Sequence, residues 1–240
     1  DVGGWDGLAY YPRDYHVAIY DTVVTGNDNV GGMYGRSTYV YEMGAYLENM
    51  TISGQNNVGG LTGKESTNVF YNTYGTRMVN STITATGENA GGIVGLRDNT
   101  TGSYSRSVTF ENVDIYAGKN AGAFYGKYGS TLTSNIANMY GLYFSGTITT
   151  NDKSTANIVV GEDLVGVSQA VRYIGFWEES TLNGTKFKDL DFGTSEVETD
   201  YPVSSLKPGF LNTSTGAVYT NYSYANAAYY DYMNQFYGIY

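Results

Sequence analysis

The chain has 240 residues, with 13 Lys and Arg against 23 Asp and Glu, a formal net charge of −10, and no cysteine. This negative charge, without a basic cluster to offset it, repels phosphates, so we expect no nucleic-acid partner. The lack of cysteine excludes disulfides, thiolate nucleophiles and thiolate metal sites. No apolar run approaches the roughly 20 residues of a membrane-spanning helix, so we also expect no membrane span.

The composition is dominated by small polar and aromatic residues, with 32 Gly, 26 Tyr and only 3 Pro. Uncharged polar residues mixed with aromatic ones suit β-sheets whose outer faces meet the exterior of a cell. We therefore expect an extracellular protein of the cell surface.

Residues 1–20 precede the repeats and contain Trp5, Tyr10 and Tyr11. Terminal units of repeat arrays usually differ from internal ones because they cover an open sheet edge, so we predict an N-terminal cap over 1–20. The only histidine, His16, lies in a strand-like segment, and the chain has no Gly-x-Ser-x-Gly motif. We expect no catalytic role for it.

A glycine-rich phrase recurs four times in residues 21–165, at intervals of 28, 32 and 31 residues. Its copies are Asn29-Val-Gly-Gly-Met-Tyr-Gly35, Asn57-Val-Gly-Gly-Leu-Thr-Gly63, Asn89-Ala-Gly-Gly-Ile-Val-Gly95 and Asn120-Ala-Gly-Ala-Phe-Tyr-Gly126. A degenerate fifth copy ends at Gly161. This period without a helical pattern predicts an all-β fold, a β-solenoid-like stack of about five repeats of 28–35 residues.

Each phrase follows a short alternating segment, such as 50–53 or 113–116, which is typical of a half-buried strand. A glycine after this segment predicts a turn, and the phrase then begins a second strand. The adjacent glycines indicate a bulge, a positive φ or a close backbone approach that recurs in each coil. A bulge would also let the apolar residues on both sides of the glycines share one face.

Asparagines recur at positions 49, 80 and 112, where stacked amides can hydrogen-bond along a solenoid. Asn49 and Asn80 also begin Asn-x-Ser/Thr sequons. Chance and ladder packing are the alternatives to glycosylation. The candidate glycosylation sites are Asn49, Asn80, Asn99, Asn183, Asn212 and Asn221.

A basic residue follows the last glycine of each phrase, at Arg36, Lys64, Arg97 (displaced by one residue) and Lys127. If the coils stack in register, we expect these charges to line one edge. They would be either solvated turn residues or a docking stripe for another subunit or an anionic glycan.

Two segments carry oxygen ligands beside glycines and are the candidate calcium sites: Gly26–Asn29 and Asp189–Gly193. Neither matches a known calcium loop, and turn chemistry also accounts for them. The carboxylate pairs Asp189 with Asp191 and Glu178 with Glu179 are the only candidates for glycosidase or lyase chemistry. A solvated loop explains both pairs more simply, so we predict no enzyme, no cofactor and no catalytic residue.

Residues 166–240 lose the repeat and become rich in tyrosine. We predict a C-terminal cap or an assembly region, because clustered tyrosines offer contact area with a polar group. The candidate assembly residues are Tyr229, Tyr230, Tyr232, Tyr237 and Tyr240.

The phrase Asn-Val-Gly-Gly-Leu-x-Gly resembles the GLUG motif, a short repeat of bacterial surface and secreted proteins. That motif occurs in large adhesins and in non-catalytic stalks of immunoglobulin-cleaving metallopeptidases. The resemblance covers about residues 22–165 and is closest at Asn57–Gly63. It implies a β-solenoid-like surface module and carries no catalytic residues. The zinc motif His-Glu-x-x-His of those peptidases is absent from the sequence.

Three functions are compatible with these patterns. The first is a structural protein that self-assembles into a surface layer, sheath or fibril. The second is an adhesin or glycan-binding module of a larger surface protein, in which aromatic residues such as Tyr39, Tyr41, Tyr46, Tyr71 and Tyr74 would stack on sugars. The third, a polysaccharide-active enzyme, is compatible with the fold alone.

Overall fold

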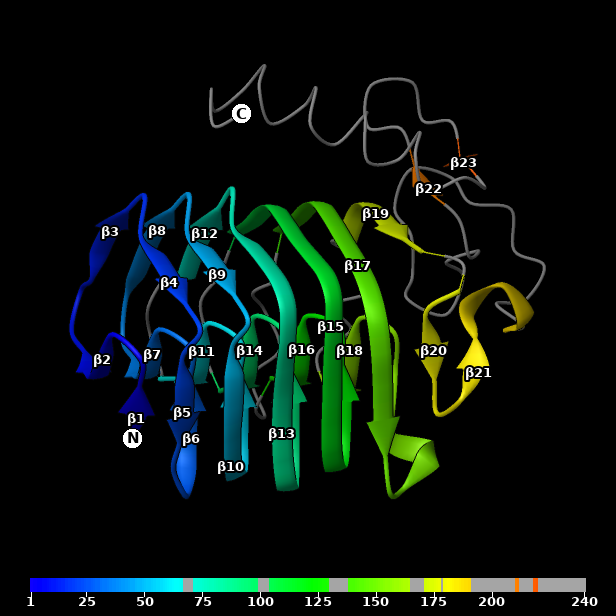
Figure 1. The fold of residues 1–240 in the computed structure, drawn as a ribbon, viewed down its shortest axis with the longest axis horizontal. Coiled ribbons are helices and arrows are strands. Elements are labelled where there is room, and N and C mark those ends of the chain that lie inside the picture. Colours follow the sequence, from blue (N-terminus) through cyan, green and yellow to red (C-terminus); the bar gives the residue numbers. More distant parts are fainter. Residues whose placement is uncertain are drawn as a thin grey trace.

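The chain folds into a β-solenoid of about five coils, as its repeats predict. The computed structural model describes residues 1–66, 71–98, 104–129, 138–164, 171–177 and 179–190, and the strands at 210–211 and 218–219. This described part contains no α-helix, and therefore none long and apolar enough to cross a membrane. Figure 1 shows the coils following one another from the blue N-terminal strands to the yellow ones.

Parallel pairing between successive coils builds a 15-stranded sheet and a 6-stranded sheet. The larger sheet holds β1 (Val2–Gly3), β3 (Arg13–Tyr15), β4 (Ala18–Tyr20), β5 (Val23–Thr25), β6 (Asp28–Gly31), β8 (Val40–Met43), β9 (Tyr46–Glu48), β10 (Thr51–Gly59), β12 (Tyr71–Tyr74), β13 (Arg77–Gly91), β15 (Tyr104–Gly122), β17 (Asn138–Thr150), β19 (Val171–Phe176), β20 (Thr181–Leu182) and β21 (Thr185–Lys186). The smaller sheet holds β2 (Asp6–Ala9), β7 (Tyr34–Ser37), β11 (Thr62–Glu65), β14 (Val94–Arg97), β16 (Tyr125–Tyr128) and β18 (Val160–Asp163).

Four short elements lie outside this pattern of parallel coils. The 3-10 helices are η1 (Lys153–Thr155) and η3 (Phe187–Asp189). The strands β22 (Phe210–Leu211) and β23 (Val218–Tyr219) pair antiparallel in a sheet of their own.

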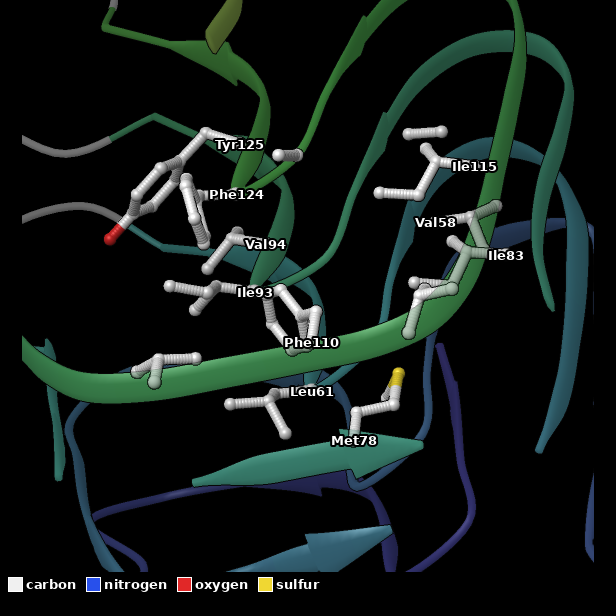
Figure 2. Packing of buried hydrophobic residues seen from close by; sticks show 14 of the residues in the cluster. Val58, Leu61, Met78, Ile83, Ile93, Val94, Phe110, Ile115, Phe124 and Tyr125 are labelled. Carbon is white, nitrogen blue, oxygen red and sulfur yellow. The ribbon is translucent and has the colours of Figure 1, made fainter. Parts of the chain in front are cut away.

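Equivalent residues of successive coils stack into columns because the strands pair in register. One interior column consists of Val24, Ile52, Ile83, Ile115 and Ile148, all buried. Strands in a sheet are about 4.8 Å apart, so each side chain packs on its equivalents above and below. Figure 2 shows Ile83 and Ile115 in this interior, with Leu61, Ile93 and Phe110 facing them. The core is therefore a set of apolar columns along the solenoid axis.

The glycine phrase lies at a corner where the two sheets nearly touch. The sequence predicts that the phrase begins a strand. Instead, its first residues end one strand, such as β6, and its last residues begin the next strand, β7. Val30 and Met33 are both buried because the chain turns between them, and no bulge is needed there. The register shifts occur earlier, for example between Gly54 and Asn56, within continuous strands where a turn is predicted.

The recurring requirement for glycine at this corner is close approach of backbones. A Cβ on Gly31 would lie 2.0 Å from the Tyr34 carbonyl oxygen and 2.8 Å from the Gly63 nitrogen. A Cβ on Gly63 would lie 2.3 Å from the Val30 nitrogen. Real Cβ atoms are not found this close to backbone atoms, so the corner has no room for a side chain.

Residues 1–20, predicted as an N-terminal cap, form a coil that pairs in register with the coil that follows it. Val2 pairs with Val30, and Asp6 pairs with Tyr34. This register makes Asp1-Val-Gly-Gly-Trp-Asp-Gly7 an additional copy of the phrase, with aspartate in the asparagine position. We define the first coil as residues 1–20; each of its strands β1 to β4 pairs with a single neighbouring strand.

A β-hairpin follows the last long strand of the larger sheet. Its first strand, β20, pairs in parallel with β17, and β21 then pairs with β20 in the antiparallel sense. Asn183 and Gly184 form the two-residue turn, with φ of 48° and 82°. Two positive φ values suit a type I′ turn, for which Asn-Gly is the favoured sequence. The parallel pairing of the coils therefore gives way to a local turn at this end.

We predict that Gly63→Ala destabilises the protein by at least about 3 kcal/mol, because its Cβ would collide with backbone that cannot move aside. Gly7→Ala is the matched control: it occupies the same column in the first coil, where the nearest atom to a Cβ is 3.2 Å away. It should cost less than about 1 kcal/mol. Urea unfolding of both variants measures these costs, and equal costs would contradict the close-approach explanation.

Candidate functional site

Two columns of asparagine run along the solenoid. The first ladder consists of Asp1, Asn29, Asn57, Asn89 and Asn120, and the second of Asp21, Asn49, Asn80 and Asn112. In the first, each Nδ2 donates to a side-chain oxygen of the preceding coil over 2.7–2.9 Å. Every asparagine in both ladders has a positive φ between 48° and 67°. Asparagine tolerates this left-handed conformation better than most residues, so the ladders also form corners.

The second ladder confirms the stacking predicted for Asn49, Asn80 and Asn112. Asn49 Nδ2 donates to Asp21 over 2.8 Å, and Asn112 Nδ2 donates to Asn80 Oδ1 over 2.9 Å. Both sequon residues, Asn49 and Asn80, are exposed, so glycosylation at them stays a prediction. Asn183 lies in the hairpin turn, where its Oδ1 accepts from the Thr150 N–H.

Arg97 does not belong to a surface stripe, contrary to the prediction. It pairs in register with Glu65, one position further along the strand than Lys64. Successive residues of a strand point to opposite faces, so this displacement turns Arg97 into the interior. Its Nη1 lies 2.9 Å from Glu65 Oε2, both side chains are buried, and its guanidinium lies 4.8 Å from the centre of the Tyr128 ring.

The other three basic residues, Arg36, Lys64 and Lys127, lie in one outer column. Leu96 lies between Lys64 and Lys127 in this column. Arg36 pairs with Asp1 over 3.4 Å, and Lys127 pairs with Glu162 over 2.8 Å. Acidic partners at both ends of the column therefore compensate its charge, and the stripe is shorter and more nearly neutral than predicted.

A second buried ionisable side chain, Glu42, lies on β8, between the neighbouring strands β3 and β12. Glu42, which is 1% exposed, accepts hydrogen bonds from the Thr73 and Thr76 hydroxyls and from the Ala45 N–H. Burial raises the pKa of Glu42 from 4.5 to about 7, although these hydrogen bonds lower it. Asp14 of the first coil, which raises this pKa further, is next in the same column and accepts from the Tyr34 hydroxyl.

Large exposed aromatic side chains gather on the first coil. Trp5, Tyr10, Tyr11, Tyr15 and Tyr20 are each between 53% and 67% exposed. Three of these tyrosines pair with tyrosines of the next coil, with ring centroids 5.4–6.1 Å apart: Tyr11 with Tyr39, Tyr15 with Tyr41 and Tyr20 with Tyr46. We call these six residues the tyrosine face.

A surface pocket of about 300 Å³ lies within the tyrosine face, between β3 and β8. Its lining consists of Arg13, Tyr15, Tyr39 and Tyr41, and Arg13 pairs in register with Tyr41. Arg13 is exposed and makes no ion pair with any described residue. The pocket thus combines aromatic rings with an available cation in an acidic protein. Tyr39 and Tyr41 were predicted as sugar-stacking candidates; Arg13 and Tyr15 were not.

The candidate catalytic and calcium-binding residues do not come together in the described part. His16 lies at an exposed corner in the left-handed conformation, Asp189 is exposed in η3, and Glu179 pairs with Lys186. Asp28, the candidate calcium ligand, accepts amide hydrogens from Asn27 and Asn56. Among the described residues, no group of three or more Asp, Glu or His side chains is placed to hold a metal ion.

Several predicted residues lie outside the described part of the chain. They are Asn99, Glu178, Asp191, Asn212, Asn221, Tyr229, Tyr230, Tyr232, Tyr237 and Tyr240. The Tyr-rich C-terminal cap or assembly region therefore stays a prediction.

Comparison of the chain with models of protein families, with curated proteins and with solved structures found no match.

We predict that the stability of the protein falls as pH rises from about 4.5 to about 7. The pKa of Glu42 is higher in the folded state, so the folded state binds the proton more tightly, and this advantage is lost above the folded pKa. The loss should amount to roughly 3 kcal/mol, at about 1.4 kcal/mol per pKa unit. Urea unfolding across this range measures it. Glu42→Gln should remove this pH dependence of stability, and the control Glu88→Gln, at an exposed position, should retain it. If the native chain and Glu42→Gln show the same pH dependence, Glu42 is not its source.

Proposed function

We propose that this chain is a non-enzymatic structural protein of the extracellular cell surface that associates with copies of itself. The observation that carries the proposal is the tyrosine face, which puts three pairs of neighbouring rings, one stacked and two tilted, on the outside of the first two coils of the solenoid. Exposed tyrosines provide large contact area at low conformational cost and keep a hydroxyl for polar partners, so they are typical of interfaces.

The burial of the charged groups supports a structural role over an enzymatic one. The Glu65–Arg97 pair and Glu42 are held by neighbouring coils inside the solenoid, where they serve the fold and have no contact with solvent. Buried ionic groups of this kind fix how adjacent elements pair more than they add stability. The resemblance to the GLUG motif and the Gly-, Tyr- and Asn-rich composition support a cell-surface location.

Self-association can be tested by sedimentation velocity over a range of concentrations and by electron microscopy of the assembled material. We expect the native chain to form oligomers or filaments and the triple variant Tyr11→Ser, Tyr15→Ser and Tyr20→Ser to associate at least about tenfold more weakly, because aromatic anchors dominate interfaces. The control Leu164→Ser with Trp177→Ser removes exposed apolar side chains from the opposite end. A native chain that stays monomeric at high concentration would end the proposal.

The Arg13 pocket favours a second candidate function, binding of an acidic glycan. Tyrosine rings can pack on the C–H faces of sugars, and a guanidinium pairs with a carboxylate through two parallel hydrogen bonds. The volume of about 300 Å³ suits one or two sugar units.

We expect a uronic-acid oligosaccharide to bind the native chain and Arg13→Gln to weaken that binding at least about tenfold, the effect of losing a charge-assisted pair. Lys119→Gln, which changes an exposed charge elsewhere, should bind like the native chain. Isothermal titration calorimetry measures both. Equal binding by the two variants, or equal binding of a neutral oligosaccharide, contradicts this candidate.

A further inference from the structure

One band of the larger sheet has an outer face whose composition differs from that of the whole chain. The band consists of β3, β8, β12, β15, β17 and β19, which pair in parallel in this order. Figure 1 shows β3, β8, β12 and β19 along the upper side of the solenoid. One column of the band, which includes Glu42, Thr73 and Ser105, is buried. Because successive residues of a strand alternate between faces, the two columns that flank it fall on the outer face.

These two outer columns combine basic and aromatic residues. The first runs through Arg13, Tyr41, Asn72, Tyr104 and Asn138. The second runs through Tyr15, Met43, Tyr74, Arg106, Tyr140 and Arg172. They hold three of the six arginines of the chain and five tyrosines, and neither column contains an aspartate or a glutamate, although the chain has a net charge of −10. We call the two columns the arginine–tyrosine face.

The arginines of this face are spaced along the solenoid axis. Neighbouring strands are about 4.8 Å apart, so the three steps from Arg13 to Arg106 cover about 14 Å and the two steps from Arg106 to Arg172 cover about 10 Å. Each of the first five strands of the band also contributes one tyrosine position to the face. A ligand that uses the whole face is therefore elongated and carries several negative charges with less polar surface between them.

The Arg13 pocket is part of this face. Arg13, Tyr15 and Tyr41 line it together with Tyr39, and its volume of about 300 Å³ suits one or two sugar units. From the pocket, the two columns continue across the following strands, and each coil adds positions at the same interval. A surface that repeats in this way is matched by a polymer of repeating units.

We propose that the arginine–tyrosine face binds a linear acidic polysaccharide, which lies across the strands and along the solenoid axis. Carboxylates of the polymer would pair with Arg13, Arg106 and Arg172, and its sugar rings would pack on the tyrosines between them. Without aspartate or glutamate in either column, the face is complementary in charge to a polyanion. This inference rests on the acidic-glycan function proposed above and extends it from one pocket to the whole face.

Calorimetric titration with digalacturonate and with polygalacturonate tests the proposal. The double variant Arg106→Gln with Arg172→Gln keeps the Arg13 pocket. We expect it to bind polygalacturonate at least about tenfold more weakly than the native chain does, and to bind digalacturonate equally well because a disaccharide fills only the pocket. Equal binding of digalacturonate also shows that the variant is folded. The control Lys119→Gln with Lys153→Gln loses the same charge at exposed positions outside the face and should bind both ligands like the native chain.

Unchanged binding of polygalacturonate by the arginine variant would overturn the proposal. Equal weakening in the lysine control, or an equal loss of digalacturonate and polygalacturonate binding in the arginine variant, would also contradict it, because neither result is specific to the extended face. The competing occupant is an acidic surface of a second copy of this chain. If the arginine variant loses self-association in sedimentation velocity but keeps its binding of polygalacturonate, the face is a protein interface instead.

The two ligands also separate this inference from the function on which it rests. A native chain that binds digalacturonate, without any effect of Arg106→Gln and Arg172→Gln on polymer binding, supports the pocket and refutes the extended face alone. Polymer binding that depends on Arg106 and Arg172, without binding of digalacturonate, refutes the pocket and supports the face. A native chain that binds neither ligand refutes both.

Discussion

The close approach of two backbones at the glycine corner is the constraint on which the rest of the structure depends. Gly31 of one coil and Gly63 of the next leave no space for a Cβ, so the two sheets can meet there in only one register. Since a shift by one residue would exchange the inner and outer faces of every strand, this corner determines where each side chain lies. A side chain at the corner would therefore disturb more than its own contacts.

The fixed register explains the chemistry of the interior as well as its packing. It turns Arg97 inward beside Glu65 while leaving Lys64 outside, and it puts Thr73 next to Glu42. Changes along the columns also compensate one another. The phrase has alanine at positions 90 and 121, in the part of the solenoid where Phe110 and Phe124 fill the interior with rings 5.7 Å apart (Figure 2). Smaller residues in one column are thus matched by larger ones in another.

The sequence predicted what repeats and little of what differs between repeats. The solenoid, its period and the stacking of Asn49, Asn80 and Asn112 follow from spacing alone. The first coil was missed because Asp1 and Trp5 disguise its copy of the phrase, although the 28-residue interval from Gly3 to Gly31 could have identified it. Arg97 was misassigned because only the register reveals its face. The environment of Glu42 depends on residues 31 and 34 positions away, and no motif marks them.

Positions available for function on this fold are limited by the same columns. Inward residues pack against their equivalents in neighbouring coils. Ladder residues must adopt the left-handed conformation of a corner and also make a side-chain amide hydrogen bond. Only outward positions between corners can change from coil to coil at low cost, and Arg13, Tyr15 and Tyr41 occupy such positions.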